Sequence, residues 1–401
     1  MCTSSNSGVN TEEKPTLGAL FRAADKSFFL GNPLSEDQVK VAHRLARCQT
    51  QAMGGHLWCC DTCGALVPMY NSCRNRNCPQ CQKMDQYRWV SARLKELLPV
   101  PYFHCVFTLP HKLNPLVYTN PRALLGALFK AAATTLLKFG ADPQWMGAKP
   151  GILMVLHTWG QKLNLHYHVH CIVTGGGLSA QKQWVPSYSE KYLFPVRAMS
   201  DVFRGLYWQY LERPLEKEKL VIPHECAAYF SNREKLKTSL HAKQWVVYAK
   251  EPFAGPTAVL KYLARYTHRT AIANSRILKY ANGMVTFRYV DYRKQRQQRL
   301  LHLPLQRFLR SFIDHVLPSG FMRIRGYGIW ANACKKKDLT WCRYLLGDPV
   351  THQPPMDTDN DEVATIEHFD FRCPHCKEGT LRFIPDAIAL IIYPTTYLDS
   401  S

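Results

Sequence analysis

The sequence predicts an α+β fold in which strands pair mainly as antiparallel hairpins. Between residues 100 and 346, short runs of aromatic and β-branched residues alternate with longer runs whose apolar residues recur at helical spacing. Two pairs of strand-like runs are joined by short polar turns, and one turn contains the Asn-Gly dipeptide typical of a two-residue hairpin. Neighbouring hairpins favour an antiparallel sheet over a doubly wound parallel sheet. A cluster of cysteines ahead of this region indicates a separate module stapled by metal.

The expected elements follow in order along the chain. A polar start leads to a helix around residues 39–48, and residues 82–98 form an amphipathic helix behind the cysteine-rich segment. The expected strands are Tyr102–Pro110, Ile152–Trp159, His166–Gly175 and a run within residues 239–253, and Ile277–Arg293 is a hairpin. The expected helices of this region are residues 121–140, which begin with proline and end with glycine, and a segment within residues 253–274 that opens with Gly-Pro.

These elements divide the chain into four segments. Residues 1–39 form an N-terminal segment, residues 40–98 a zinc-binding domain with its connecting helix, and residues 99–345 the larger α+β domain. Residues 346–401 comprise a linker rich in proline and aspartate and a C-terminal tail that carries one more Cys-x-x-Cys knuckle.

The charge of the chain indicates a polyanionic partner. Its 401 residues include 51 Lys and Arg against 30 Asp and Glu, a formal net charge of +21. Nucleic acid is the favoured partner, and an anionic membrane surface is the competing interpretation. No segment reaches the roughly 18 consecutive apolar residues of a membrane span, and the N-terminus lacks the apolar core of a signal peptide. We therefore expect a cytoplasmic protein with no membrane partner, whose 15 cysteines are metal ligands or core thiols rather than a disulfide framework.

Two Cys-x-x-Cys pairs predict a structural zinc site. Cys60 with Cys63 and Cys78 with Cys81 form the pairs, and fourteen residues separate them. Two such knuckles can close a tetrahedral site of four thiolates, a spacing that buried apolar cysteines would not need.

Other ligand-type residues nearby suggest further metal binding. Cys48, His56 and Cys73 are three ligands of a second zinc site that lacks its fourth, for which Cys59 is a candidate. We expect one or two zinc ions in this domain. The C-terminal Cys373 and Cys376 make only half a site, with Cys334, Cys342 and His368 as loosely spaced candidate partners.

Three histidines alternate along one of the expected strands. Alternate residues share a face, so His166, His168 and His170 point the same way. His166 and His170 would lie roughly 13 Å apart, too far to share one ion, whereas neighbours in this series can share one. If the intervening turn closes a regular hairpin, position 157 pairs with 168 and position 159 with 166. We therefore expect a divalent ion on His168 and His170 with His157 as third ligand, and Gln161 or His166 as alternatives.

Tyr262 and Tyr266 are the candidate nucleophiles. An open site on histidines suits Mg²⁺ or Mn²⁺ acting on a phosphodiester, with zinc as the alternative ion. A phenol has a pKa near 10, so polarisation of the phosphate by the metal must offset its weak nucleophilicity. Attack would leave a 5′-phosphotyrosine and a free 3′-OH. Tyrosines four residues apart are often core residues of a helix, but the basic residues around this pair favour catalysis.

Four arginines are candidate DNA contacts. Arg265 and Arg269 lie beside the tyrosines, and Arg74 and Arg76 lie among the cysteines. For the cysteine module, a purely structural role without DNA contact is nearly as plausible.

These motifs together resemble a known family. The chain resembles the two-tyrosine HUH transposases of the insertion-sequence-ninety-one (IS91) family from about residue 40 to residue 345. The matching motifs are HCVFTLPHKLN at residues 104–114, LHTWGQKLNLHYHVHCIVTGGGL at 156–178, YLARYTHRTAIANSRI at 262–277 and IRGYGIWAN at 324–332, and the cysteine module resembles the family's zinc-binding domain.

The resemblance implies a fold and an activity. It implies an HUH-type nuclease domain with a central antiparallel sheet flanked by helices, in which HVH binds the metal and Tyr262 and Tyr266 form the catalytic pair. The expected reaction nicks single-stranded transposon ends and transfers them to target DNA, in a bacterial protein associated with the nucleoid when it acts. One departure is Asn77, where the family commonly has a histidine before the last Cys-x-x-Cys, the ligand that the second zinc site lacks.

Three other functions compete with transposition. A replication initiator or relaxase would use the same histidines and tyrosine. A zinc-containing DNA-binding regulator would do no chemistry and would leave the HVH strand idle. An inactive transposase copy is disfavoured by the intact histidines and tyrosines.

Overall fold

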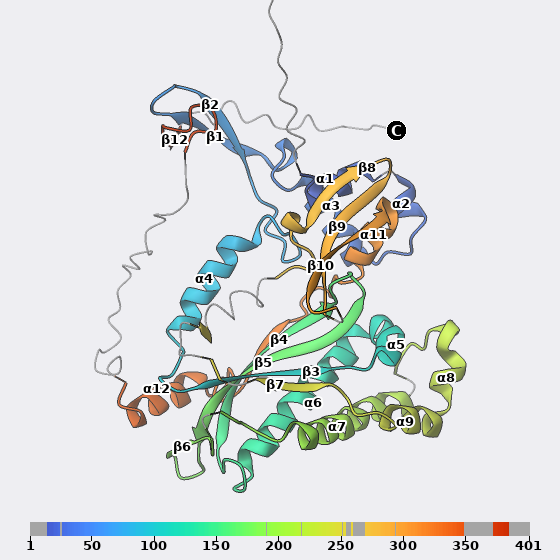
Figure 1. Ribbon diagram of the computed structural model, residues 1–401, viewed down its shortest axis with the longest axis vertical. Helices are drawn as coiled ribbons and strands as arrows, with labels where there is room; N and C mark the ends of the chain where they lie inside the picture. Colours follow the sequence, from blue (N-terminus) through green and yellow to red (C-terminus); the bar gives the residue numbers. More distant parts are fainter. Residues whose placement is uncertain are drawn as a thin grey trace, which may run out of the picture.

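The computed structural model describes residues 14–24, 26–189, 191–217, 219–250, 252–253, 258–259, 269–292, 294–348 and 372–384. Tyr262, Tyr266 and Arg265 lie outside these residues, as does most of the helix expected within residues 253–274. The described chain has a mixed α+β fold, with antiparallel sheets flanked by helices and a cysteine-rich zinc-binding domain toward the N-terminus (Figure 1).

The largest sheet lies at the centre of the molecule. Its strands run in the order β11-β4-β5-β3-β7, every neighbouring pair is antiparallel, and β6 pairs with the end of β5. The bounds are β3 Tyr102–Thr108, β4 Lys149–Trp159, β5 Leu165–Leu178, β6 Trp184–Pro186, β7 Val247–Lys250 and β11 Ile324–Gly328. The order shows that the hairpin β4-β5 occupies the middle of the sheet, where it is paired on both sides.

Helices cover one face of this sheet (Figure 1). They are α5 Asn114–Thr119, α6 Pro121–Ala141, α7 Val196–Glu216, α8 Ala227–Ser231 and α9 Arg233–His241. Pro121 begins α6 as expected, but Gly140 does not end it. Gly140 is buried in the last turn, where a Cβ atom would lie 2.5 Å from Cδ of Pro150, so glycine permits close contact with β4. By length and composition α6 could cross a membrane, but core helices share these properties, and 61% of its apolar window is buried.

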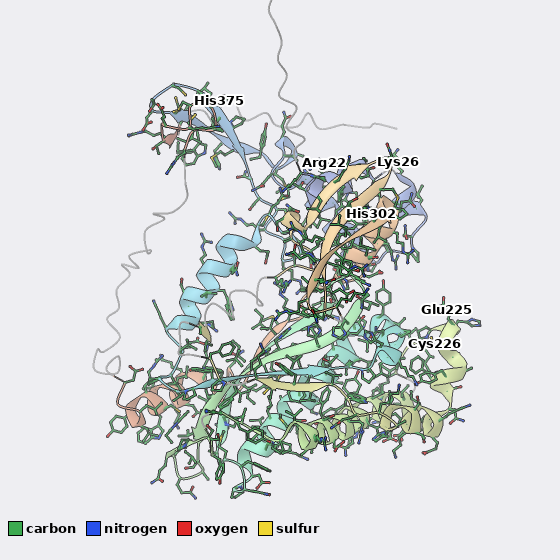
Figure 2. All side chains as sticks on the ribbon, in the orientation of Figure 1. Arg22, Lys26, Glu225, Cys226, His302 and His375 are labelled. Carbon is green, nitrogen blue, oxygen red and sulfur yellow. The ribbon has the colours of Figure 1, made fainter. Side chains whose placement is uncertain are left out.

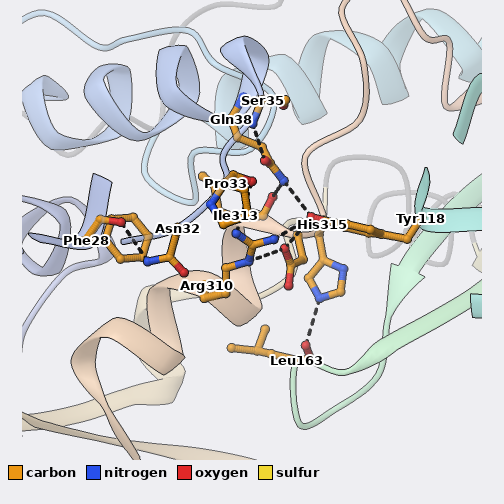
Figure 3. Close-up of polar contacts among 11 residues, drawn as sticks. Phe28, Asn32, Pro33, Ser35, Gln38, Tyr118, Leu163, Arg310, Ile313 and His315 are labelled. Carbon is orange, nitrogen blue, oxygen red and sulfur yellow. Dashed lines mark hydrogen bonds and ion pairs between the residues drawn. The ribbon is translucent and has the colours of Figure 1, made fainter. Parts of the chain in front are cut away.

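A second core joins the N-terminal helices to elements between residues 271 and 313. The N-terminal helices α1 Leu17–Ala23, α2 Lys26–Leu30 and α3 Glu36–Arg47 share it with α11 Leu305–Ile313 and the sheet of β8 Ile277–Ala281, β9 Met284–Asp291 and β10 Gln297–Pro304. The side-chain amide of Gln38 in α3 donates a hydrogen bond of 3.2 Å to the carbonyl of Ile313 (Figure 3). The N-terminal helices therefore pack on a hairpin that the sequence places in the larger domain.

The turn of that hairpin has the expected chemistry. Asn282 and Gly283 have φ angles of 50° and 72°, and both lie in the left-handed region that a type I′ turn requires. The Asn-Gly signal therefore locates β8 and β9 correctly.

The third sheet is small and lies apart from the central sheet (Figure 1). Its order is β12-β1-β2, with bounds β1 Gly55–Cys60, β2 Leu66–Tyr70 and β12 Leu381–Phe383. The helix α4 Gln82–Leu94 runs between this small sheet and the central sheet. The helix α12 Lys335–Leu345 packs beside the start of β3 and the end of β5 in the central sheet. Short 3-10 turns occur at Gln51–Met53, His111–Leu113, His224–Cys226 and Asn274–Arg276.

Candidate functional site

Three histidines converge on the face of the central sheet opposite α6. One ring nitrogen each of His157, His168 and His170 lies within 4.8 Å of the others. His157 pairs directly with His168 across β4 and β5, as the hairpin register predicts. The expected pairing of 159 with 166 is displaced, because a register shift after His157 pairs Trp159 with Leu165. The middle of the sheet thus presents three imidazoles from two adjacent strands.

Hydrogen bonds orient two of these rings. Nδ1 of His168 lies 2.9 Å from the backbone carbonyl of His166, so this nitrogen is the donor and Nε2 carries the lone pair. Nδ1 of His170 lies 3.0 Å from Nε2 of His104 on β3. If His170 donates there, its Nε2 is also available as a ligand. His104 is not among the ligands predicted from the sequence, although it alternates with Val106 and Thr108 on one face of β3.

The environment keeps the histidines in the form that binds metal. Desolvation lowers the pKa of His168 to about 3, and the positive charges of His166 and Arg269 add to the effect. Desolvation also lowers the pKa of His170 well below its usual value, with smaller effects from His157 and His168. Metal binding requires a neutral imidazole, so the rings of His168 and His170 are ready to bind a divalent ion at neutral pH.

The two alternative ligands lie outside this cluster. The ring of His166 stacks on that of His111 with centroids 5.2 Å apart. The side-chain oxygen of Gln161 accepts a hydrogen bond of 3.4 Å from the backbone N–H of Val290. The His166 ring therefore borders the cluster, with its centroid 4.7 Å from that of His168, whereas Gln161 is bonded elsewhere.

Eight of the described cysteines form two groups, and the expected grouping of Cys60, Cys63, Cys78 and Cys81 in one site is wrong. One group contains Cys48, Cys73, Cys78 and Cys81, and the other contains Cys60, Cys63, Cys373 and Cys376; the sulfurs in each group lie within 4.8 Å of one another. The two N-terminal knuckles therefore belong to different sites, and Cys78 and Cys81 complete the site of Cys48 and Cys73 in place of the expected His56 and the candidate Cys59.

The first group is built into the second core. Its sulfur atoms are separated by 3.2 Å between Cys48 and Cys81 and by 3.6 Å between Cys73 and Cys81. Gln49 and Arg74 directly follow two of the cysteines and have φ angles of 54° and 49°, a conformation that turns the chain sharply around the sulfurs. Cysteine clusters of this kind fit structural zinc.

The remaining candidate ligands lie elsewhere. The exposed ring of His56 contacts that of Phe383 with centroids 5.5 Å apart. The sulfur of Cys59 faces the carbonyls of Cys60 and Gly64, each at 3.6 Å. Cys334 precedes α12 and Cys342 is buried within it, and His368 lies outside the described residues. The expected partners of the C-terminal knuckle are therefore replaced by Cys60 and Cys63.

A cationic cleft of about 880 Å³ runs along the edge strand β11. Six cationic residues line it against one carboxylate, Glu96: Arg76, Arg93, Arg122, Arg323, Arg325 and Lys335. Aromatic rings line it too, among them Trp89 and Phe321. Arg323 links the cleft toward the histidines, because its guanidinium donates to the carbonyl of Arg269 at 3.4 Å. Cations interleaved with aromatic rings are typical of surfaces that bind single-stranded nucleic acid.

The four arginines expected at DNA differ in their surroundings. Arg74 and Arg269 are exposed, and Arg265 lies outside the described residues. Arg76 instead donates to the carbonyls of Leu317, Pro318 and Phe321 at 2.7 to 3.1 Å. These bonds tie the cysteine-rich segment to the loop ahead of β11, and Arg76 also lines the cationic cleft, so its contact with DNA stays a prediction.

Comparison with known proteins matches both halves of the chain. A family model described as "Putative transposase" matches residues 151–337, and one described as "Transposase zinc-binding domain" matches residues 20–109. The chain is 39% identical over 376 residues to "Putative transposase y4qJ" of Sinorhizobium fredii, covering 92% of this chain and 94% of the relative. It is 31% identical over 303 residues to "Transposase for insertion sequence element IS801" of Pseudomonas savastanoi pv. phaseolicola, covering 75% and 72%. No solved structure matches the chain.

Proposed function

The chain belongs to the IS91 family of transposases, and we propose that it moves its element by metal-assisted nicking of single-stranded DNA with Tyr262 and Tyr266 as nucleophiles. The reaction is of the rolling-circle type, acts on the ends of the element and on target DNA, and takes place at the bacterial nucleoid in the cytoplasm. The observation that carries the proposal is the cluster of His157, His168 and His170 at the middle of the sheet.

The donor set fits a catalytic ion. His157, His168 and His170 would hold Mn²⁺ or Mg²⁺, which would polarise a non-bridging phosphate oxygen and stabilise charge on the leaving 3′-oxygen. Three imidazoles are softer ligands than the oxygens that Mg²⁺ prefers, so this set favours Mn²⁺, with zinc as the alternative. Three protein ligands also leave positions for phosphate, as a catalytic site requires.

The tyrosines would exchange one ester bond for another. The phenolic oxygen of Tyr262 or Tyr266 attacks phosphorus, its proton passes to solvent, and the bond from phosphorus to the 3′-oxygen breaks. The products are a 5′-phosphotyrosine and a free 3′-OH, which can attack such an ester in the reverse sense to join strands. Two tyrosines allow the protein to hold two ends in succession.

Arg269 supports the pairing of these tyrosines with the histidines. Tyr266 precedes Arg269 by three residues, a separation that no conformation extends beyond about 11 Å. Arg269 in turn lies close enough to lower the pKa values of His168 and His170 through its charge, behind desolvation and the neighbouring histidines. The cationic cleft along β11 approaches the same point through Arg323, and it would guide the DNA strand to the histidines.

Trapping of a covalent adduct tests the proposal. The full-length protein is incubated with a labelled single-stranded oligonucleotide that carries an end of the element, with Mn²⁺, and the adduct is mapped by peptide sequencing. We expect phosphotyrosine at residues 262 and 266, loss of one adduct in each single Phe variant, and loss of both in the double variant. Tyr292→Phe, which removes an exposed phenol on another element, should change nothing.

The histidines are tested in the same assay. His168→Ala/His170→Ala should abolish the adduct while DNA binding, measured by fluorescence anisotropy, persists. Adducts that survive the double tyrosine substitution would overturn the nucleophile assignment. Normal nicking by the histidine variant in the presence of a chelator would overturn the metal assignment, and binding without any adduct would indicate a regulator.

A further inference from the structure

Two cysteine knuckles from opposite ends of the chain meet at the small sheet. The sulfurs of Cys60 and Cys376 lie 3.7 Å apart, and those of Cys63 and Cys373 also lie 3.7 Å apart. We propose that these four cysteines bind a second zinc ion, which clasps the C-terminal tail to the N-terminal zinc-binding domain. The matched zinc-binding family region ends at residue 109, so the C-terminal half of this zinc clasp lies outside it.

The sulfur spacing fits zinc. Zinc–thiolate bonds of about 2.3 Å in a tetrahedron place neighbouring sulfurs about 3.8 Å apart. The two sulfur–sulfur distances of 3.7 Å between the knuckles match this value and exceed the roughly 2.05 Å of a disulfide. The four thiols therefore have the spacing of ligands around one ion.

In both knuckles, backbone N–H groups point at the cysteine sulfurs. In the first, the backbone N–H groups of Thr62 and Cys63 point at the sulfur of Cys60 at 3.4 and 3.5 Å. In the tail, His375 N–H points at the sulfur of Cys373 at 3.4 Å and Gly379 N–H at that of Cys376 at 3.3 Å. Such N–H groups stabilise thiolates, the form in which cysteine binds metal.

The backbone repeats the same turn after each knuckle. The N–H of Gly64 bonds the carbonyl of Cys60 at 3.0 Å, and the N–H of Lys377 bonds that of Cys373 at 2.9 Å. Gly64 and Lys377 have φ angles of 69° and 63°, so each knuckle closes through a residue in the left-handed region. Only one of the two is glycine, so the tail maintains this turn at a conformational cost.

Contacts around the sulfurs hold the tail in register but are too few to hold it alone. β12 adds three residues to the edge of β1, and Asp61 accepts a hydrogen bond of 2.8 Å from the N–H of Thr380. Among the residues that the structure describes, the local buried core consists of Cys60, Cys373 and Leu381, with a few partly buried neighbours. An isolated strand of this length is marginal in water, so an ion shared by both knuckles would supply the missing stability.

Counting zinc per chain tests the clasp. Native mass spectrometry of the full-length protein, without DNA, should find one zinc ion fewer in Cys373→Ser/Cys376→Ser than in the wild type. Cys226→Ser, a control far from the tail knuckle that carries His375 (Figure 2), should match the wild type. An equal zinc count in the tail variant and the wild type would overturn the proposal. The zinc count does not depend on DNA cleavage, so its outcome tests the clasp independently of the proposed nuclease chemistry.

A second experiment tests the assembled geometry without removing a ligand. A Cβ atom on Gly379 would lie 2.4 Å from the sulfur of Cys60, whereas one on Gly205 in α7 meets nothing within 4 Å. With a specific protease site inserted within residues 352–360 and cut, the C-terminal fragment should remain with the body on gel filtration and leave when a chelator is added. Gly379→Ala should weaken retention of the fragment at least tenfold, and Gly205→Ala should not. Release of the wild-type fragment in the presence of zinc would overturn the clasp.

Discussion

His104 offers a test of how the sheet prepares the histidines for metal. Its ring is 5% exposed, and its Nε2 lies 3.0 Å from Nδ1 of His170. Desolvation lowers the pKa of His104 to about 3, so the ring is neutral and can accept the proton of His170 through Nε2. This hydrogen bond fixes the tautomer of His170 that leaves Nε2 for the ion. His104→Phe keeps a buried ring and removes the acceptor.

The size of the effect follows from the lost acceptor. A buried N–H without a partner costs about 1–3 kcal/mol. Without metal, His170 can avoid much of that cost by moving its proton to Nε2. The cost therefore appears when metal binds and the other tautomer is required. Loss of an outer hydrogen bond to a metal-binding histidine typically costs about 10–100-fold in affinity, or about 1.4–2.7 kcal/mol.

The assay is a Mn²⁺ titration of single-strand nicking, with the thermal melting of the metal-free protein measured alongside. His104→Phe should raise the half-saturating Mn²⁺ concentration about 10–100-fold, with melting little changed and nicking largely restored at high Mn²⁺. His104→Gln, which retains an acceptor oxygen, should recover part of the affinity. His302→Phe, on the separate sheet of β10, should match the wild type. An unchanged titration midpoint in His104→Phe would refute this role.

Three further predictions concern stability. Gly328 has φ of +60°, and a Cβ atom there would lie 1.8 Å from the carbonyl oxygen of Pro150, whereas Gly320 has φ of +73° and open space around it. Gly328→Ala should therefore lower the free energy of unfolding by at least about 2 kcal/mol more than Gly320→Ala does. Equal losses in urea titrations would contradict this. Burial lowers the pKa of His315 to about 4, so the unfolded chain takes up a proton below pH 6.5 before the native one does. On going from pH 7.5 to 5.5, the wild type should therefore lose about 1.4 kcal/mol more than His315→Gln, and parallel pH profiles would refute the shift. Cys78→Ser, in the buried first cysteine group, should remove one zinc and lower the free energy of unfolding by more than about 4 kcal/mol, and a retained zinc count would contradict that grouping.

The sequence predicts the histidine cluster because its geometry is local. His157 and His168 belong to one hairpin, so the turn between them determines which residues lie opposite. The prediction fails two residues further on, at Trp159, because the bulge there has no marker in the composition of the turn. Hairpin geometry does not predict that His104 lies beside His170, because this contact depends on the register of β3 against β5, which no short turn determines.

The cysteine grouping shows the corresponding limit for long-range contacts. The spacing of Cys60 from Cys63 and of Cys78 from Cys81 correctly indicates two knuckles, since each knuckle is a local turn. Which knuckles meet depends on the whole chain path, and the partners of the first knuckle are more than 300 residues away, with Cys63 and Cys373 separated by 310. Asn77 also loses its significance, because the first cysteine group has four ligands without a histidine at that position.

The two kinds of metal site should respond differently to metal removal. Pairing of β4 with β5 already places His157 and His168 opposite each other, so the histidine cluster persists without an ion. An ion bound there should therefore be removed and replaced without refolding, and three imidazoles leave open positions for substrate. Four thiolates fill a tetrahedral ion, and in the zinc clasp they hold together segments that have few other contacts. Chelation should therefore first remove nicking, reversibly, and only under stronger conditions release the tail. If the tail were released before nicking was lost, the order of affinities argued from the donor atoms would be wrong.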